Sequence, residues 1–167
     1  SKAVSVYSIR NFKFLGFALG RNNNGTYIRV HAKSMKKAKQ KLKALTSRSQ
    51  GRNVRAVMHK VKVYMQGWLG YYAIADMKNT IDDWNGWLRR RIRMYIWKQW
   101  KKPKTRVKNL QRLGTPEWAA YSYGNSRKGY WRMSGTTTLN NALSNERLAQ
   151  EGYFDISQKY KSLHLCD

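Results

Sequence analysis

The sequence predicts a mainly α-helical protein, in which an N-terminal β-hairpin precedes an amphipathic helical bundle and a short helical C-terminal tail. Apolar residues recur at helical spacing through residues 54–72 and 81–100, which indicates two long amphipathic helices. Before them, two short apolar runs flank an Asn- and Gly-rich turn, a pattern typical of a hairpin. After them, Pro and Gly divide the chain into short helical segments.

The hairpin is expected within residues 12–30. Residues 12–19 would form its first strand, and residues 27–30 would form the returning strand. The residues between them include Asn22 and Gly25, which tolerate the positive φ angles of a tight turn. Because a two-stranded hairpin is marginal alone, we expect it to pack on the helices or on another domain.

Cap residues set the expected limits of the helices. Ser34 is expected to cap a helix that runs to about Arg48, and Asn53 to cap the next, which reaches about residue 75. A third long helix is expected over residues 79–101. Shorter helices are expected over residues 104–113, from Pro116 onward, over residues 137–143 and up to Glu151, followed by a tail with an apolar periodicity.

The charge of the chain predicts a polyanionic partner. Its 34 Lys and Arg residues face 8 Asp and Glu residues, which gives a formal net charge of +26. Such a charge opposes compaction through self-repulsion, so nucleic acid is the first expected partner and an anionic membrane surface the second. No transmembrane segment or signal peptide is recognisable, so of these two candidates only nucleic acid is retained as the expected partner, without a membrane.

Cysteine and histidine usage predicts neither a disulfide nor a metal site. Cys166 is the single cysteine, and His31, His59 and His164 are scattered without metal-ligand spacing. A lone cysteine near the chain end suggests a reducing, cytoplasmic compartment.

Cations gather beside the apolar stripes of the predicted helices, where they would meet phosphate groups. The candidate RNA contacts are Lys36, Lys37, Lys41, Arg52, Arg55, Arg89, Arg90, Arg93, Trp97, Lys101, Lys102, Lys104 and Arg106. A lysine run is also typical of a merely solvated helix face. Trp97 is either a base-stacking residue or a core residue, whereas Trp68, Trp84, Trp87 and Trp100 are expected in the core.

Catalytic residues are not expected in this chain. Asp82-Asp83 is its only adjacent acidic pair, and a polymerase needs paired carboxylates that hold two metal ions. We expect the pair in the first turn of a helix, where the helix dipole favours carboxylates. A metal-dependent nuclease using Asp76, Asp82 and Asp83 remains an alternative, as does a ribosome-like structural RNA-binding protein.

Two motifs of this chain resemble a known family. Gly67-Trp68-x-x-Tyr71-Tyr72, followed by Trp84, an Arg-rich helix and Trp100, resembles the maturase-specific domain of group II intron reverse transcriptases, also called domain X or the thumb. Phe14-Leu15-Gly16-Phe17 is similar to the last block of the reverse transcriptase palm. The resemblance divides the chain into the end of the palm (1–32), a thumb-like maturase-specific domain (33–114) and a C-terminal helical extension (115–167).

The resemblance also implies a function. It implies binding of group II intron RNA to assist splicing, and a grip on the RNA–DNA primer–template duplex during RNA-directed DNA synthesis. The rest of the reverse transcriptase is then a partner, and Mg²⁺ belongs to the parent's polymerase site, with no cofactor in this fragment. The catalytic palm would precede Ser1, and the expected location is the cytoplasm of a bacterium or the interior of an organelle.

Overall fold

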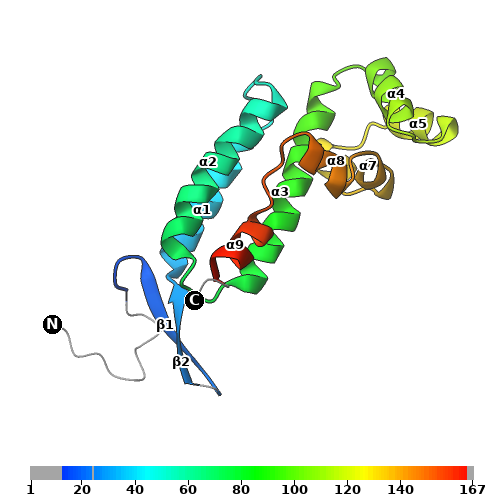
Figure 1. Ribbon diagram of the computed structural model, residues 1–167. Coiled ribbons are helices and arrows are strands. Elements are labelled where there is room, and N and C mark those ends of the chain that lie inside the picture. The colour runs from blue at the N-terminus through cyan, green and yellow to red at the C-terminus, as the bar shows by residue number, and fades with distance from the viewer. Residues whose placement is uncertain (1–12, 24, 165–167) are drawn as a thin grey trace.

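A computed structural model describes residues 13–23 and 25–164, and it confirms the mainly α fold with an N-terminal hairpin (Figure 1). The long helices are α1 (Ala32–Leu45), α2 (Val54–Tyr72) and α3 (Lys78–Gln99). They lie side by side, with the hairpin at one end of the molecule and the α4–α5 pair at the other. The shorter helices are α4 (Pro103–Arg112), α5 (Glu117–Gly124), α6 (Tyr130–Met133), α7 (Thr137–Ala142), α8 (Asn145–Gln150) and α9 (Ile156–His164).

The hairpin pairs β1 (Phe17–Asn22) with β2 (Gly25–Val30) in antiparallel register. The first strand starts later than predicted because a tight turn precedes it: Phe14 bridges to Phe17, and Leu15 and Gly16 have φ angles of 50° and 88°. A Cβ atom at residue 16 would also lie 2.3 Å from the Tyr72 hydroxyl. Gly16 therefore lets the chain turn while resting against α2. The predicted strand residue 12 lies outside the described residues.

The start of α1 differs from the prediction. His31, not Ser34, caps this helix, and its Nδ1 accepts a hydrogen bond from the Lys33 backbone N–H at 3.1 Å. The Ser34 hydroxyl instead donates to the carbonyl oxygen of Gly16 and so connects α1 to the hairpin. The helix ends at Leu45, before the predicted Arg48.

The limits of α2 and α3 follow the predictions more closely. Asn53 caps α2 as predicted, because its side-chain oxygen accepts from the Arg55 N–H at 2.8 Å. Helix α3 begins at Lys78, so Asp82 and Asp83 lie in its second turn and not in the first, contrary to the prediction. No helix in the described ranges is long and apolar enough to cross a membrane.

The main hydrophobic core lies between the three long helices and α9. Val57, Met65, Leu69, Leu88 and Ile92 are completely buried or nearly so, which leaves one apolar stripe of α2 facing one of α3. From α9, Ile156 and Tyr160 join the same core. The Tyr160 hydroxyl donates to the Ala75 carbonyl at 2.8 Å and accepts from the Met77 N–H, which fixes the turn between α2 and α3.

A second core forms beyond the last turns of α3. It contains Trp97, Val107, Leu110, Ala120, Met133, Leu139, Ala142 and Leu143. Helices α4 and α5 approach closely, because a Cβ atom at Gly124 would lie 2.5 Å from a methyl carbon of Val107. Since α3 contributes to both cores, it is the element that holds the molecule together.

Candidate nucleic-acid interface

Helix α1 presents an uninterrupted basic surface. The predicted contacts Lys36, Lys37 and Lys41 are all exposed, as are Lys39 and Lys43. No acidic residue occurs within the helix. These ammonium groups therefore form an accessible set of positive charges on one long helix, which is the arrangement that phosphate binding requires.

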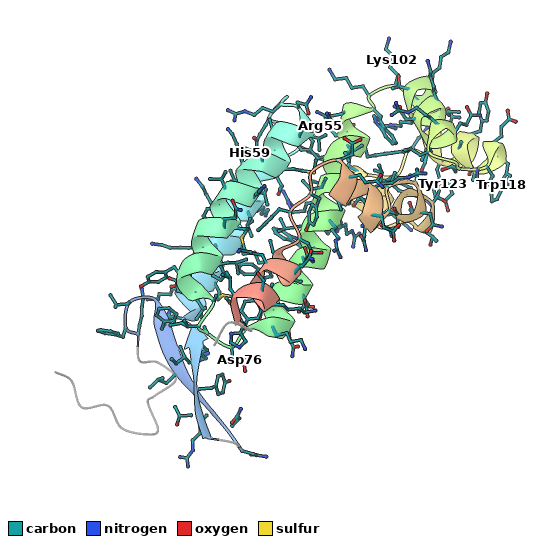
Figure 2. The ribbon with its side chains drawn as sticks, viewed as in Figure 1. Arg55, His59, Asp76, Lys102, Trp118 and Tyr123 are labelled. Atoms are coloured by element: carbon teal, nitrogen blue, oxygen red, sulfur yellow. The ribbon has the colours of Figure 1, made fainter. Side chains whose placement is uncertain are left out.

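A second group of exposed cations lies where α3 passes into α4. Lys101, Lys102 and Lys104 are exposed there, and Arg52 is exposed before α2. Figure 2 shows Lys102 extending outward from the link between α3 and α4. The structure therefore leaves these four predicted contacts available to a ligand.

Arg55 is exposed but already has a partner. Its guanidinium forms an ion pair with the Glu151 carboxylate at 2.8 Å, and both side chains are more than half exposed. A surface pair of this kind contributes little to stability and exchanges readily with a competing anion. Arg55 thus remains a candidate contact, but the nearby Glu151 carboxylate offsets its positive charge, unlike the charges of the α1 lysines.

The predicted contact Arg89 belongs to a partly buried polar network. It pairs with the Asp155 carboxylate, which also accepts a hydrogen bond from the Asn85 side chain at 2.9 Å. The Tyr153 hydroxyl donates to the Asn85 side-chain oxygen at 2.8 Å, and burial raises the pKa of Tyr153 above its usual value. Arg89 therefore joins α3 to the segment before α9.

Arg93 is buried, so the structure does not place this predicted phosphate contact on the exposed surface. Only 8% of the residue is exposed. Its Nε donates to the Leu143 carbonyl at 2.8 Å, and a terminal nitrogen donates to the Asn145 side-chain oxygen at 2.9 Å. Burial lowers the pKa of Arg93, and the positive charge of Arg89 lowers it further. Arg93 instead holds the connection between α7 and α8 against α3.

Of the two roles expected for Trp97, the structure favours the core residue, because Trp97 is 1% exposed and lies in the second core. The guanidinium of Arg106 lies over its ring at 4.8 Å from the centroid. The Arg106 Nε donates to the Trp100 carbonyl at 2.8 Å. Arg106, a predicted RNA contact, is thus half-buried and helps to close the link between α3 and α4.

The structural role of Arg91 was not predicted from the sequence. Its Nε donates to the Thr46 hydroxyl, and its terminal nitrogen donates to the carbonyls of Lys43 and Thr46 at 3.0 and 3.2 Å. These groups lie at the C-terminal end of α1, where carbonyls lack helical partners and a cation is favourable. Burial lowers the pKa of Arg91. A run of arginines on one helix did not reveal which of them point inward.

The family-motif residues form an aromatic cluster between α2 and the hairpin. The ring centroids of Trp68 and Tyr72 are 4.8 Å apart, and those of Phe17 and Tyr72 are 5.0 Å apart. The Tyr71 hydroxyl donates to the Leu15 carbonyl at 2.9 Å, which ties the two motifs together. Phe14 and Leu15 are exposed, as is Gly67.

The tryptophans expected in the core are buried to different degrees. Trp84 is 4% exposed and belongs to the main core, as predicted. Trp68, Trp87 and Trp100 are partly buried and pack against the two cores. Trp118 is 75% exposed on α5, where Figure 2 shows it at the far end of the molecule.

Arg90, the remaining predicted arginine, stacks on an aromatic ring that the sequence did not single out. Its guanidinium lies over the Trp131 ring at 4.1 Å from the centroid and donates to the Trp131 carbonyl at 3.0 Å. Trp131 is exposed and lines a hollow together with Trp87 and lysines of α1. The sequence pattern that could have pointed to Trp131 is an aromatic residue directly before an arginine, in the segment Tyr130-Trp131-Arg132.

Asp76, Asp82 and Asp83 do not form the cluster that a metal-dependent nuclease requires. Within residues 13–23 and 25–164, no three His, Cys, Asp or Glu side chains are grouped so that they could hold a metal ion. Asp82 and Asp83 are exposed on α3, and Figure 2 shows Asp76 at the opposite end of the long helices from Lys102.

These features define a basic, mainly helical module with two hydrophobic cores and with exposed lysines on α1 and at the α3–α4 link. A comparison with protein families identifies it further, because residues 35–114 match the family described as the group II intron, maturase-specific domain. Over these residues the chain is therefore similar to the maturase-specific domain of group II intron proteins. The match extends from α1 through α4 and includes the aromatic motif at Gly67–Tyr72. No curated protein sequence matches the chain.

Proposed function

We propose that this protein binds group II intron RNA through the exposed cations of α1 and of the α3–α4 link, and thereby assists splicing of the intron. The observation that carries the proposal is the position of Lys36, Lys37 and Lys41: all three are exposed on an acid-free helix, and all three lie within the matched maturase-specific region. Structured RNA offers the dense phosphate charge that such a surface attracts.

The proposal includes a role in reverse transcription. As the thumb of a larger reverse transcriptase, the same helices would hold the RNA–DNA primer–template duplex by its phosphates. The catalytic carboxylates and their Mg²⁺ would then belong to the rest of the parent protein, which is also a partner. The parent would act in the cytoplasm of a bacterium or inside an organelle.

The test is a titration of the purified chain with four ligands at two salt concentrations. The ligands are folded intron RNA, an RNA–DNA duplex, single-stranded DNA of equal length, and heparin. If ~6 phosphates are neutralised, the association constant for intron RNA should fall roughly a thousandfold between about 50 and 200 mM salt. Intron RNA and the duplex should bind more tightly than single-stranded DNA and heparin at the higher concentration.

Equal affinity for all four ligands at about 150 mM salt would contradict the proposal, because only charge would then matter. A flat salt dependence would contradict the assignment of lysines as the contacts. Primer extension by this chain alone should stay at the level of a protein-free blank, since the proposal places the polymerase site elsewhere in the parent.

A further inference from the structure

Beside the lysines of α1 lies a hollow of about 370 Å³, which we name the tryptophan groove. It is lined by Lys36, Lys39, Gln40, Lys43, Trp87, Arg91 and Trp131. These residues come from α1, α3 and α6, three elements far apart in the sequence. The volume falls within the range of sites for small organic groups, and it is far too small for a duplex.

The groove combines the two features that single-stranded nucleic acid requires. All four of its charged lining residues are cations, and the three lysines among them are exposed at the edge of α1. Its two tryptophans supply flat apolar surfaces beside those charges. Phosphates on a positive rim and bases on aromatic rings are the shared design of proteins that bind unpaired strands.

The Trp131 ring is held in place by its neighbours but is not buried. Arg90 covers one side of its ring, and the buried Nε of Arg90 has no hydrogen-bond partner among the described residues. A Cβ atom at Gly135 would lie 2.8 Å from that guanidinium, so glycine is needed for Arg90 to reach this position. The ring is thus fixed in place while 39% of the residue stays exposed.

Trp87, the other tryptophan of the lining, also has cations against its ring. The Arg91 guanidinium lies 5.1 Å from its ring centroid, and the Lys39 ammonium lies 5.6 Å away. Arg91 is itself held by the carbonyls at the end of α1. Such prior ordering reduces the entropy that binding must otherwise remove.

We infer that the tryptophan groove binds an unpaired nucleotide of the RNA, with its base stacked against Trp131 and its phosphates near Lys36, Lys39 and Lys43. A base inside a duplex has both faces covered by its neighbours, so only a looped-out or single-stranded base offers a free face to the ring. This inference rests on the proposed function and makes it specific: α1 holds phosphates, and the groove selects an unpaired residue among them.

The first test compares three RNAs on the unaltered chain: a hairpin with a uridine loop, the same hairpin with abasic loop residues, and a blunt duplex of the same stem. The uridine hairpin should bind roughly five- to a hundredfold more tightly than the abasic one, which is the range for stacking of one base on an aromatic side chain. Abasic and blunt RNAs should bind alike.

The second test replaces the ring. Trp131→Ala should remove the preference for the uridine hairpin while leaving affinity for the blunt duplex unchanged, and Trp131→Phe should keep most of the preference. Trp118→Ala is the matched control, because Trp118 is exposed but lies outside the groove. Melting temperatures of all three variants show whether they fold. Photo-crosslinking of a 5-iodouridine loop should attach RNA to the peptide that contains Trp131.

The outcomes separate this inference from the proposed function. Tight, salt-sensitive binding with equal affinity for the uridine and abasic hairpins would overturn the inference that the tryptophan groove binds an unpaired nucleotide. The proposed function would remain intact. Failure to bind any of the three RNAs would overturn both. Because the abasic comparison needs no substitution, it decides the question even if Trp131→Ala unfolds.

Discussion

Helices α1 and α3 are both rich in cations, yet they use them in opposite ways. The lysines of α1 are exposed and line the hollows of the surface. Most of the arginines of α3 are committed to the fold: Arg89 pairs with Asp155, Arg91 holds the end of α1, and Arg93 holds Leu143. Positive charge in a sequence therefore does not by itself mark a binding surface.

The chemistry of the two side chains explains the difference. A guanidinium is a planar fork that donates to several carbonyls at once and is weakly hydrated, so it suits buried polar positions. An ammonium is a strongly hydrated point charge on a flexible stem, and it stays in water unless a partner is supplied. In this protein the arginines of α3 mostly join helices, whereas the lysines of α1 stay exposed.

The largest expected effect on stability comes from Trp97→Ala on α3. Trp97 is 1% exposed and fills the second core, so its truncation should lower the free energy of unfolding by about 3–5 kcal/mol. Chemical denaturation monitored by far-ultraviolet circular dichroism measures this. Trp118→Ala is the control, since its exposed ring should contribute less than about 0.5 kcal/mol. A stable Trp97→Ala protein that no longer binds RNA would restore the surface role for Trp97.

A smaller loss is expected when an α3 arginine is removed. Arg93→Ala deletes two hydrogen bonds from a cation and leaves the Leu143 carbonyl without that donor, so unfolding should become easier by about 1.5–3 kcal/mol. The matched substitution on α1 is Lys41→Ala, which should change stability by less than about 0.5 kcal/mol. Equal losses for the two variants would remove the distinction between the helices.

Replacing the lysines of α1 should separate binding from stability. The triple variant Lys36→Gln, Lys37→Gln, Lys41→Gln removes three exposed charges and should keep the melting temperature of the parent chain or raise it slightly, because self-repulsion falls. Its affinity for RNA should decline, and the slope of log affinity against log salt should become shallower by about 2–3. An unchanged slope would show that these lysines do not contact phosphate.

The order of the helices and strands was predictable from caps, apolar periodicity and glycines, because each of these acts within a few residues. Asn53 caps α2, Trp84 is buried in the stripe of α3, and Gly152 follows α8 with a φ angle of 101°. The late start of β1 was not predictable, since it depends on a turn at Leu15–Gly16 that rests against Tyr72 on a distant helix.

The burial of some candidate contact residues has one physical source. Helical periodicity assigns a single buried face to each helix, whereas α3 is covered on several sides by α1, α6, the α7–α8 connection and α9. Arg93 and Trp97 lie off the predicted stripe and are buried by these later elements. The tryptophan groove escaped prediction for the same reason, because Trp87 and Trp131 meet only after the chain has folded.

The smallest expected effect concerns His31, which caps the N-terminal end of α1. Its pKa lies below 6.5, first because of partial burial and then because of the charges of Lys13, Lys33 and Arg29. The folded state therefore favours the neutral ring, whose Nδ1 accepts from the Lys33 N–H. This stabilisation is complete above the unfolded pKa and is lost as pH falls from about 6.5 through the lower folded value. It should amount to less than about 1 kcal/mol, the usual scale for a cap.

Titration of His31 by NMR also tests the comparison between the two helices. Bound phosphates would partly neutralise Lys33 and Lys13, so RNA should raise the pKa of His31 toward or above its value in a model peptide. His59 on α2 is exposed and is not part of this cap, so it serves as the internal reference. A pKa of His31 that stays depressed at saturating RNA would place the phosphates away from the start of α1. A rise in pKa at His31 and not at His59 would show that RNA binds near the exposed lysines at the start of α1.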